Sequence, residues 1–442
     1  MNTAANARDL PQTDPTSDQI SRGSSGRLRI LILDEDIPYP PNAGKSCRTW
    51  NLLRRLALRH SICLLCYGSP SLPGAMALQS AGIRLRLVEP RTNPQGWRLY
   101  LRLFLNLFSS FPFPVTKHYS LSFQRQFEAL LKEEPWDLIQ CEWTPYARFI
   151  SHAERTPVLI ATHNVESHIW ARRANQAGNP FEKVFFKIQE WKMRRFEKWA
   201  LLRASAATAV TSPEVATLRD WGVVSVTLVP NGVDLDTYCA TPEAECEDEL
   251  LFLASLDWYP NVDALDYFVK DIFPAVRARR FGATLRIVGR KPPESLTKRY
   301  SRFPGVNFVG EVQEVRSHLD RASVVVVPLR IGGGSRIKIL EAMAAGKAVV
   351  STTIGAEGLD VVSGEHLVIA DSPSEFALRI EDLLASTKAR RLLGNNGRKL
   401  VIDRYSWDQI ANRLESVWYD VSEHQAALRS VPLSPFRFEV TR

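Results

Sequence analysis

Cysteine is scarce in this chain, with six residues among 442. The six show no paired C-x-x-C modules, so neither a zinc framework nor a disulfide scaffold is expected. Cys63 and Cys66 have the spacing of a redox pair, but they lie in the apolar segment 61–67, which has the character of a strand. Residues three apart on a strand point to opposite faces, so we expect ordinary buried thiols and no metal site.

Long apolar runs are also missing. No stretch of 18 uncharged apolar residues occurs, which excludes a transmembrane helix of the usual kind. Residues 1–26 are polar and lack the apolar core of a signal peptide, so we expect a disordered tail there and another at 429–442. The expected location is the cytoplasm.

The chain does have the composition of a globular protein, with 45% hydrophobic and 24% charged residues. Its length is too great for one ordinary core and favours two domains. The net charge of +8 and the pI near 9.2 favour anionic partners, which include nucleotides, nucleic acids and acidic membrane surfaces. Charge alone does not choose among them.

Short apolar runs alternate with helical segments in two successive series. The first series of expected strands is 28–33, 61–66, 83–88, 137–141, 158–161, 206–210 and 226–229; the second is 250–254, 284–288, 306–309, 323–327, 348–350 and 367–370. Such alternation predicts parallel sheets covered by helices. A turn signal at 230–234 separates the series, so the predicted fold is α/β, with doubly wound domains at 27–230 and 231–405 that face a central cleft.

The segment 328–346 predicts an anion site in the second domain. Three glycines, Gly332 to Gly334, follow an apolar strand and lead directly into a helix. Glycines let backbone N–H groups approach a ligand, and the helix adds the positive end of its dipole. The ligand would lie at the carboxyl edge of the sheet, where open α/β folds bind ligands.

The helix that follows these glycines has one apolar and one polar side. With about 100° per residue, its apolar arc contains Ile337, Ile339, Leu340, Met343 and Ala344. Lys338 and Glu341 lie together on the other side, where Lys338 could neutralise a diphosphate and Glu341 could accept hydrogen bonds from two ribose hydroxyls. Alternatively, Lys338 and Glu341 form an ordinary i,i+3 surface pair.

Two stretches of the first domain mix arginine or lysine with large apolar residues. Residues 97–113 are rich in leucine and aromatic residues with interspersed arginines, and residues 181–202 form a long amphipathic helix. On this helix one arc holds Phe181, Val184, Phe185, Ile188, Trp191, Phe196 and Trp199, and its flank holds Lys183, Lys187, Arg194 and Lys198. The pattern indicates a membrane-surface or acceptor-side feature, or a core-facing helix whose cationic side chains cover apolar surface.

Several motifs together resemble those of retaining GT-B glycosyltransferases of family 4, the group 1 glycosyl transferases. The motifs are PNGVD at 230–234, the PN of YPN at 259–261, IVGR at 287–290, VNFVGEV at 306–312, GGGSRIKILEAMAAGKAVVST at 332–352 and IGAEGL at 354–359, with weaker matches at 38–53 and 162–173. The resemblance implies two Rossmann-like domains and a hexosyl transfer from a nucleotide-sugar to a glycan or a lipid-linked acceptor, with retention and without a metal or other cofactor. It further implies that the helix 406–428 crosses back to the first domain, and that the product belongs to surface polysaccharide or glycoconjugate synthesis.

The resemblance also assigns residues to roles. In the second domain the donor-binding set is Gly332, Gly333, Gly334, Ser335, Arg336, Lys338, Glu341, Arg290, Val309, Gly310 and Glu357. In the first domain Gly44, Arg48 and Asn164 lie on the acceptor side. The catalytic set is His163, beside the transferred sugar, with Lys338 and Glu341.

This chain departs from the family pattern in two places. The Arg and Lys pair that many members carry early in the second domain is absent from 256–261, so Arg336 and Lys338 would have to supply that charge. The second departure concerns a glutamate. Many members carry a second glutamate eight positions before the equivalent of Glu341, and Gly333 stands there. Backbone N–H groups of the glycine loop or the Glu357 side chain would have to replace that contact, so the sequence does not identify the sugar, the nucleotide, the acceptor or the linkage.

Three other functions stay open from the sequence. The first is a glycosyltransferase-like protein that binds nucleotide without turnover. The second is a sugar-nucleotide isomerase, for which His163 and Glu142 are the candidate acid and base. The third is a nucleic-acid-binding protein, although the chain shows no recognised nucleic-acid module, and we expect no nucleic-acid partner. A peripheral contact with an anionic membrane surface at the inner face is compatible with the transferase reading.

Overall fold

The protein is described by a computed structural model that covers residues 26–41, 44–89, 96–152, 156–239, 245–331 and 336–428. Both predicted tails lie outside these ranges, apart from Gly26. The glycine loop, with Gly332, Gly333, Gly334 and Ser335, also lies outside the described residues.

The first lobe contains a seven-stranded parallel sheet in the order β3-β2-β1-β4-β5-β6-β7. Its strands are β1 (Arg29–Asp36), β2 (Ser61–Tyr67), β3 (Arg84–Val88), β4 (Leu138–Cys141), β5 (Val158–Ala161), β6 (Ala206–Ala209) and β7 (Val226–Leu228). The central strands are almost entirely buried, as expected for a parallel sheet that is covered by helices on both faces.

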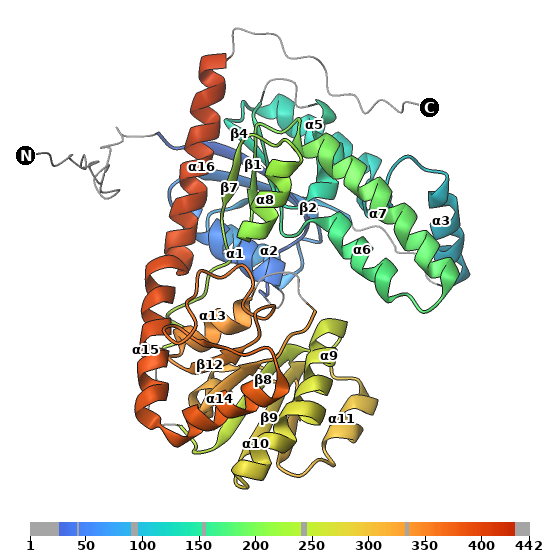
Figure 1. Cartoon of the computed structure of the whole chain (residues 1–442). Helices are drawn as coiled ribbons and strands as arrows, with labels where there is room; N and C mark the ends of the chain where they lie inside the picture. Colours follow the sequence, from blue (N-terminus) through green and yellow to red (C-terminus); the bar gives the residue numbers. More distant parts are fainter. Residues whose placement is uncertain are drawn as a thin grey trace, which may run out of the picture.

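Helices connect these strands and cover the sheet. They are α1 (Gly44–Leu56), α2 (Pro73–Ser80), α3 (Trp97–Leu107), α4 (Phe113–His118), α5 (Leu121–Glu133), the 3-10 helix η1 (Thr144–His152), α6 (Glu166–Gln176), α7 (Pro180–Leu201) and α8 (Ser212–Asp220). Pairs such as α6 and α7 form a long hairpin that projects to one side of the lobe (Figure 1).

The second lobe repeats the architecture with a six-stranded parallel sheet in the order β10-β9-β8-β11-β12-β13. Its strands are β8 (Glu249–Ser255), β9 (Thr284–Arg290), β10 (Val306–Gly310), β11 (Val324–Val327), β12 (Ala348–Ser351) and β13 (Val368–Ile369). Its helical segments are α9 (Tyr259–Tyr267), the π-helix η3 (Phe268–Ile272), α10 (Phe273–Arg279), α11 (Glu294–Tyr300), α12 (Arg316–Arg321), α13 (Ile337–Ala344), α14 (Pro373–Ala385) and α15 (Thr387–Arg404).

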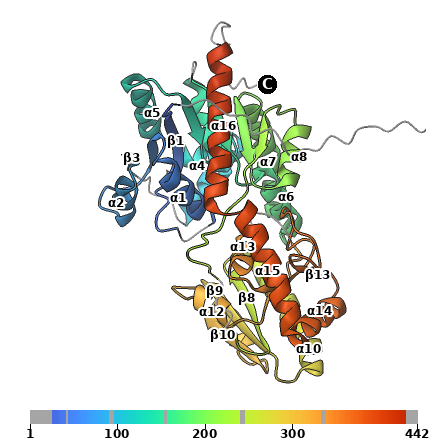
Figure 2. The same ribbon diagram turned by 90° about the vertical axis from the view of Figure 1, so that its left-hand side faces the viewer.

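The last helix, α16 (Trp407–Leu428), returns to the first lobe. Figure 2 shows α15 and α16 as successive helices that lead along one side of the molecule from the second lobe to the first. Trp407 and Trp418 are fully buried, and the Trp418 indole donates to Gln140 Oε1 at 2.6 Å. The core of the first lobe is therefore completed by a helix that follows the second lobe in the chain.

The chain crosses between the lobes twice at one place. Val233 forms a bridge with Ser406, and its N–H donates to the Tyr405 carbonyl at 2.9 Å. Gly232 packs so closely on this second crossing that a Cβ there would lie 2.7 Å from two carbons of the Trp407 ring. Both links between the lobes thus pass through one narrow zone.

The α/β, two-sheet fold expected from the sequence is confirmed. Every expected strand coincides with a strand of the structure, although β13 extends over only Val368–Ile369. Cys63 and Cys66 are buried free thiols of β2, as expected. Among the described helices, none combines the length and the apolar character needed to cross a bilayer.

Candidate donor site between the lobes

A cavity of about 1320 Å³ lies between the two lobes. Its walls are formed by the beginning of α1 and by α6 in the first lobe, and by α13 and the loops that follow β8, β9 and β10 in the second. The cavity therefore opens at the carboxyl edge of the second sheet, where ligands of open α/β folds bind.

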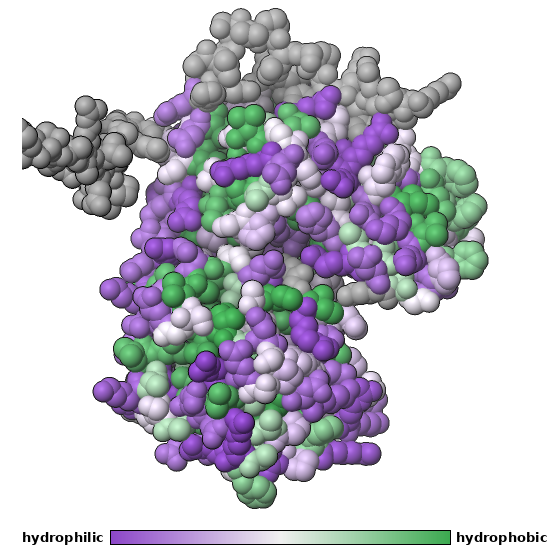
Figure 3. Space-filling model, viewed as in Figure 1, coloured by the Kyte–Doolittle hydropathy of each residue, from purple (hydrophilic) through white to green (hydrophobic). Residues whose placement is uncertain are grey.

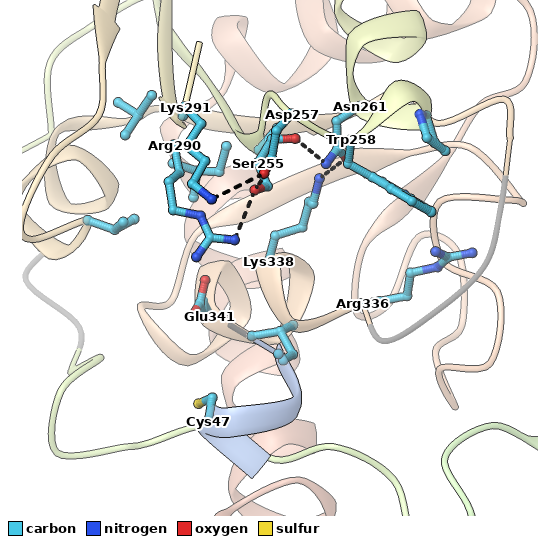
Figure 4. A pocket seen from close by; sticks show the side chains of 18 of the residues that line it. Cys47, Ser255, Asp257, Trp258, Asn261, Arg290, Lys291, Arg336, Lys338 and Glu341 are labelled. Carbon is cyan, nitrogen blue, oxygen red and sulfur yellow. Dashed lines mark hydrogen bonds and ion pairs between the residues drawn. The ribbon is translucent and has the colours of Figure 1, made fainter. Parts of the chain in front are cut away.

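Helix α13 turns its polar side toward this cavity. Ile339, Leu340 and Met343 are buried in the core of the second lobe, whereas Lys338 and Glu341 line the cavity (Figure 4). Ile337 was expected on the buried arc; it is only half-buried and also lines the cavity. The 3.6-residue period of this helix thus separates the core residues from a pair of opposite charges.

Lys338 and Glu341 each have a partner on another element, which argues against a simple surface pair. The Lys338 Nζ donates to Asn261 Oδ1 at 2.9 Å, and the Tyr238 hydroxyl donates to Glu341 Oε1 at 3.0 Å. Burial raises the pKa of Glu341 to about 7, although the Tyr238 hydrogen bond and the Lys338 charge oppose the rise. Burial, reinforced by the charge of Arg336, lowers the pKa of Lys338 to about 8.

Arg336 stands immediately before α13 and is 6% exposed. Its guanidinium donates to the Ile354 carbonyl at 2.8 Å and to Glu357 Oε2 at 3.3 Å. Arg336 lines the cavity, whereas Glu357 is half exposed beyond it and is tied to this arginine. The two predicted donor residues are therefore neighbours.

The far end of the cavity is formed by polar side chains after β8 and β9. The Arg290 guanidinium donates to Ser255 Oγ at 3.2 Å, and this hydroxyl donates to Asp257 at 2.7 Å (Figure 4). Val309 and Gly310 end β10 just before the lining residue Glu311, and Gly310 has a φ of +84°, which favours glycine.

Sequence reasoning did not assign Ser255, Asp257, Trp258 or Asn261 to the site. Ser255 is the last residue of β8, Asp257 and Trp258 follow it, and Asn261 lies in the first turn of α9. All four line the cavity. Their position at the carboxyl end of a parallel strand is the signal that could have identified them.

The first-lobe wall includes Gly44 at the start of α1, Cys47 one turn later, and Asn164. Gly44 and Asn164 thus lie where acceptor-side residues were expected. Arg48 lies behind this wall: it is 2% exposed, and its guanidinium donates to the Pro230 carbonyl at 2.6 Å and to Asn231 Oδ1 at 3.2 Å. The structure therefore places Arg48 as a link from α1 to the interlobe crossing.

His163 precedes Asn164 but is not among the residues that line the cavity. Its Nε2 lies 3.2 Å from Glu142 Oε2, and Thr49 and Gln140 also hydrogen-bond to this carboxylate. Burial alone would raise the pKa of Glu142, but His163 and Arg48 bring it below its usual value. The pKa of His163 is itself lowered, mainly by burial. His163 and Glu142 therefore form a buried pair beside the cavity.

Within the described ranges, no group of three or more histidine, cysteine, aspartate or glutamate side chains is arranged to hold a metal ion. The cavity instead offers cations and hydrogen-bond donors from the second lobe: Lys338, Arg336, Arg290 and Lys291. Such a set suits an anionic ligand that also carries hydroxyl groups.

Two parallel α/β sheets that face a polar interlobe cavity, with the last helix crossing back to the first lobe, define the GT-B class of two-domain enzymes. Residues 44–232 match the glycosyl transferase 4-like domain, and residues 247–386 match glycosyl transferases group 1. The chain belongs to the GT-B glycosyltransferases of this family 4, group 1 type.

Individual relatives agree with this assignment. The phosphatidyl-myo-inositol mannosyltransferase of Mycobacterium tuberculosis is 27% identical over 215 residues, which are 44% of this chain and 54% of that protein. The lipopolysaccharide 1,2-N-acetylglucosaminetransferase of Salmonella typhimurium is 25% identical over 222 residues, which are 44% of this chain and 58% of that protein. The matches thus span just over half the length of these curated relatives.

A solved structure supports the fold over nearly the whole chain. The crystal structure of Anabaena HepE in complex with UDP and glucose aligns with a TM-score of 0.62 at 14% identity, and the alignment covers 88% of this chain and 99% of that one. At this identity the similarity concerns the fold.

Proposed function

We propose that this protein transfers a hexosyl group from a nucleotide-sugar to a glycan or lipid-linked acceptor, with retention of configuration and without a metal ion. The observation that carries the proposal is the polar side of α13, which presents Lys338 and Glu341 to the interlobe cavity while each is held by a partner from another element. A carboxylate and an ammonium about one helical turn apart suit a ribose and a diphosphate.

The proposed chemistry assigns most of the rate acceleration to the second lobe. As the bond to the sugar breaks, positive charge develops at the sugar and negative charge on the departing diphosphate. Lys338 and Arg336 would stabilise that negative charge in the cleft between the lobes, where Arg336 is 6% exposed and fixed cations act more strongly than in water. Glu341 would hold the ribose and so fix the position of the diphosphate against these cations.

The proton of the acceptor hydroxyl would pass to the leaving phosphate in this scheme. His163 lies behind the cavity wall, so it would support the sugar site through its neighbour Asn164, which lines the cavity, rather than serve as an obligatory base; its lowered pKa favours the neutral ring at pH 7. Glu142, its partner at 3.2 Å, would fix the tautomer and the orientation of the ring. The same pair gives an isomerase no acid and base that face the cavity.

The acceptor proposed here is a lipid-linked or surface-polysaccharide glycan. One curated relative is named for transfer to a phosphatidylinositol lipid, and another for transfer to lipopolysaccharide. HepE, which shares the fold, was crystallised with UDP and glucose, so UDP-sugars are the first donors to test.

A panel of nucleotide-sugars, screened by thermal stabilisation and by sugar transfer, tests the function. A true donor at about 100 times its dissociation constant should add roughly 2.7 kcal/mol to the free energy of unfolding. Glu341→Ala should lose this stabilisation and the transfer activity, while its own melting curve stays cooperative. Glu294→Ala, which removes a carboxylate that is 81% exposed on α11, is the matched control and should behave as wild type.

Two results would count against the proposal. Normal turnover by the Glu341→Ala variant would show that Glu341 on α13 is not needed to bind the donor. Stabilisation by nucleotide-sugars with neither hydrolysis nor transfer on any acceptor would favour a binding protein without turnover.

A further inference from the structure

An apolar surface lies on the outer end of the first lobe and has no role in the donor site. It begins at α3, where only the short polar side chain of Asn106 is buried. The neighbouring large side chains are exposed: Trp97, Tyr100, Leu101, Phe104, Leu105 and Phe108. A solvent-exposed helix with this many aromatic and leucine side chains marks a contact site rather than ordinary surface.

The N-terminal half of α7 continues this surface. The C-terminal half packs into the core through Met193, Phe196 and Ala200, as one of the sequence interpretations expected. The apolar stripe nearer the N-terminus is left outside: Phe181 is 86% exposed, and Val184 and Trp191 are each 60% exposed. A shallow groove of about 440 Å³ runs along this half, between Lys183 and Trp191.

Hydrogen bonds fix α3 against α7. The Gln189 amide donates to Asn106 Oδ1 at 2.8 Å, and the Lys192 Nζ donates to the carbonyls of Asn106 and Leu107 at 2.7 and 2.9 Å. Both helices therefore present their apolar side chains at the same end of the lobe, where Figure 3 shows a hydrophobic cluster on the right-hand edge. We call the exposed side chains of residues 97–108 and 181–194 the α3–α7 surface.

Basic side chains accompany these apolar ones. Arg98 on α3 and Lys183 and Arg194 on α7 are exposed, and the sequence of α3 contains no acidic residue. The same half of α7 also carries Glu182, which is exposed, and Glu190, which pairs with Lys187 at 2.8 Å. If two copies of this surface met about a two-fold axis, each copy would bring the same set of cations to the interface. A flat partner with an anionic surface and an apolar interior could bind the basic side chains at its surface and take up the apolar side chains below it.

We propose that the α3–α7 surface docks on an anionic lipid bilayer. Its tryptophan, tyrosine and phenylalanine side chains would enter the boundary between head groups and acyl chains, as in amphipathic helices that lie in the membrane plane. Arg98, Lys183 and Arg194 would bind the anionic head groups, each adding to the affinity.

This docking would also orient the enzyme. Helix α6 packs along α7, and its residues Ile169 and Arg172 line the interlobe cavity. The first-lobe wall of the cavity is thus one helix away from the α3–α7 surface, so a lipid-linked acceptor could reach it from the same bilayer. Membrane docking does not depend on donor binding, and the two can be tested separately.

The test is co-sedimentation of the full chain with vesicles of phosphatidylcholine, with and without phosphatidylglycerol. We expect binding to the anionic vesicles that weakens with added salt. The variant Trp97→Ser/Phe104→Ser/Phe181→Ser, which changes only exposed side chains, should bind at least about tenfold more weakly. Lys183→Glu/Arg194→Glu should lose a similar factor on anionic vesicles.

Matched controls lie on the second lobe. Phe281→Ser removes an aromatic side chain that is 85% exposed, and Arg302→Glu/Lys388→Glu reverses two exposed charges; both should bind vesicles as wild type does. All variants should keep their nucleotide-sugar stabilisation. The proposal is overturned if the wild type ignores anionic vesicles, if the α3–α7 variants bind equally well, or if light scattering shows a dimer that those variants dissolve.

Discussion

Glu341 would bind the donor in its deprotonated form and Lys338 in its protonated form, and the two lie on the same helix. Their pKa values are about 7 and about 8. If ribose binding needs the carboxylate, donor affinity rises as the pH passes through the pKa of Glu341, about 7. If diphosphate binding needs the ammonium, affinity falls again above the pKa of Lys338, about 8. The dependence of donor affinity on pH should therefore be bell-shaped, with its maximum between these values.

Tyr238→Phe separates the two limbs of that curve. The tyrosine hydroxyl donates to Glu341 and holds its pKa down, so its removal should move the acidic limb to higher pH and leave the basic limb in place. Titration calorimetry of the donor across the pH range would measure both limbs. An unchanged acidic limb in the variant would contradict the assignment of that limb to Glu341.

At this scale the sequence could predict the cavity-facing pair but not what holds it. The period of the helix separates Lys338 and Glu341 from their apolar neighbours, and that local information was sufficient. Tyr238 and Asn261 contact the pair across 103 and 77 positions, and such distant pairings depend on the complete fold.

Glu197 shows how one element is fixed by another. This glutamate of α7 is 1% exposed, and its carboxyl oxygens accept from the N–H groups of Glu166 at 2.7 Å and Ser167 at 3.0 Å, at the beginning of α6. Burial raises the pKa of Glu197 to about 8. The helix that lines the cavity with Ile169 and Arg172 is thus anchored by a buried carboxyl group.

The raised pKa has a consequence for stability that can be measured. The pKa of this carboxyl group is about 8 in the folded protein and near the ordinary glutamate value of 4.5 in the unfolded chain. Its contribution to stability is therefore fully present below pH 4.5 and is lost as the pH rises through 8. Glu197→Gln, which mimics the protonated form, should lose less stability than wild type between neutral pH and pH 9. Denaturant melts at the two pH values would show the difference; equal losses would contradict it.

The packing of α15 on α13 gives a prediction at the element scale. A Cβ at Gly394 would lie 2.0 Å from the Gly346 carbonyl oxygen, which belongs to the turn after α13. Alanine usually stabilises a helix relative to glycine by up to about 1 kcal/mol. Gly394→Ala should instead lower the free energy of unfolding by at least about 1–3 kcal/mol.

Its neighbour Asn395 is exposed on the same helix, so Asn395→Ala serves as the control and should be neutral or slightly stabilising. Urea unfolding of both variants measures the effect. A Gly394→Ala variant that is more stable than wild type would contradict the prediction, because α13 and α15 could then move apart with no loss in the free energy of unfolding.

Helix α7 shows why element-scale prediction from sequence is incomplete. Its apolar arc was expected as one surface, either in the core or on a membrane, but Phe196 is buried whereas Phe181 is 86% exposed. The apolar residues repeat with the same helical period along the whole of α7, so the sequence does not show where burial ends. The surrounding helices of the lobe cover only the C-terminal half of α7, and that depends on the complete fold.

For the whole molecule, the size of the cavity predicts a domain motion. Its volume of about 1320 Å³ exceeds the range of about 300–1,000 Å³ that is usual for ligand pockets. Closing the lobes around the donor would remove this excess and exclude water. Both interlobe crossings lie together near Val233 and Ser406, which allows such a rotation.

Small-angle scattering can detect the closure. We expect the radius of gyration to fall when a donor nucleotide-sugar is added to the wild type, and to stay constant for Glu341→Ala, which should not bind it. Saturating donor that leaves the wild-type radius unchanged would contradict closure, because binding would then occur in the open form.

The return of α16 to the first lobe also determines the order in which the molecule can fold during synthesis. The core of that lobe includes Trp407 and Trp418, which leave the ribosome only after the entire second lobe. At about 5–20 residues per second, the earlier lobe waits on the order of ten seconds with an uncovered apolar face. The second lobe can therefore complete its folding before the first lobe does. A substitution near residue 407 that weakens the packing of α16 would be expected to cause misfolding of the first lobe, at the other end of the chain.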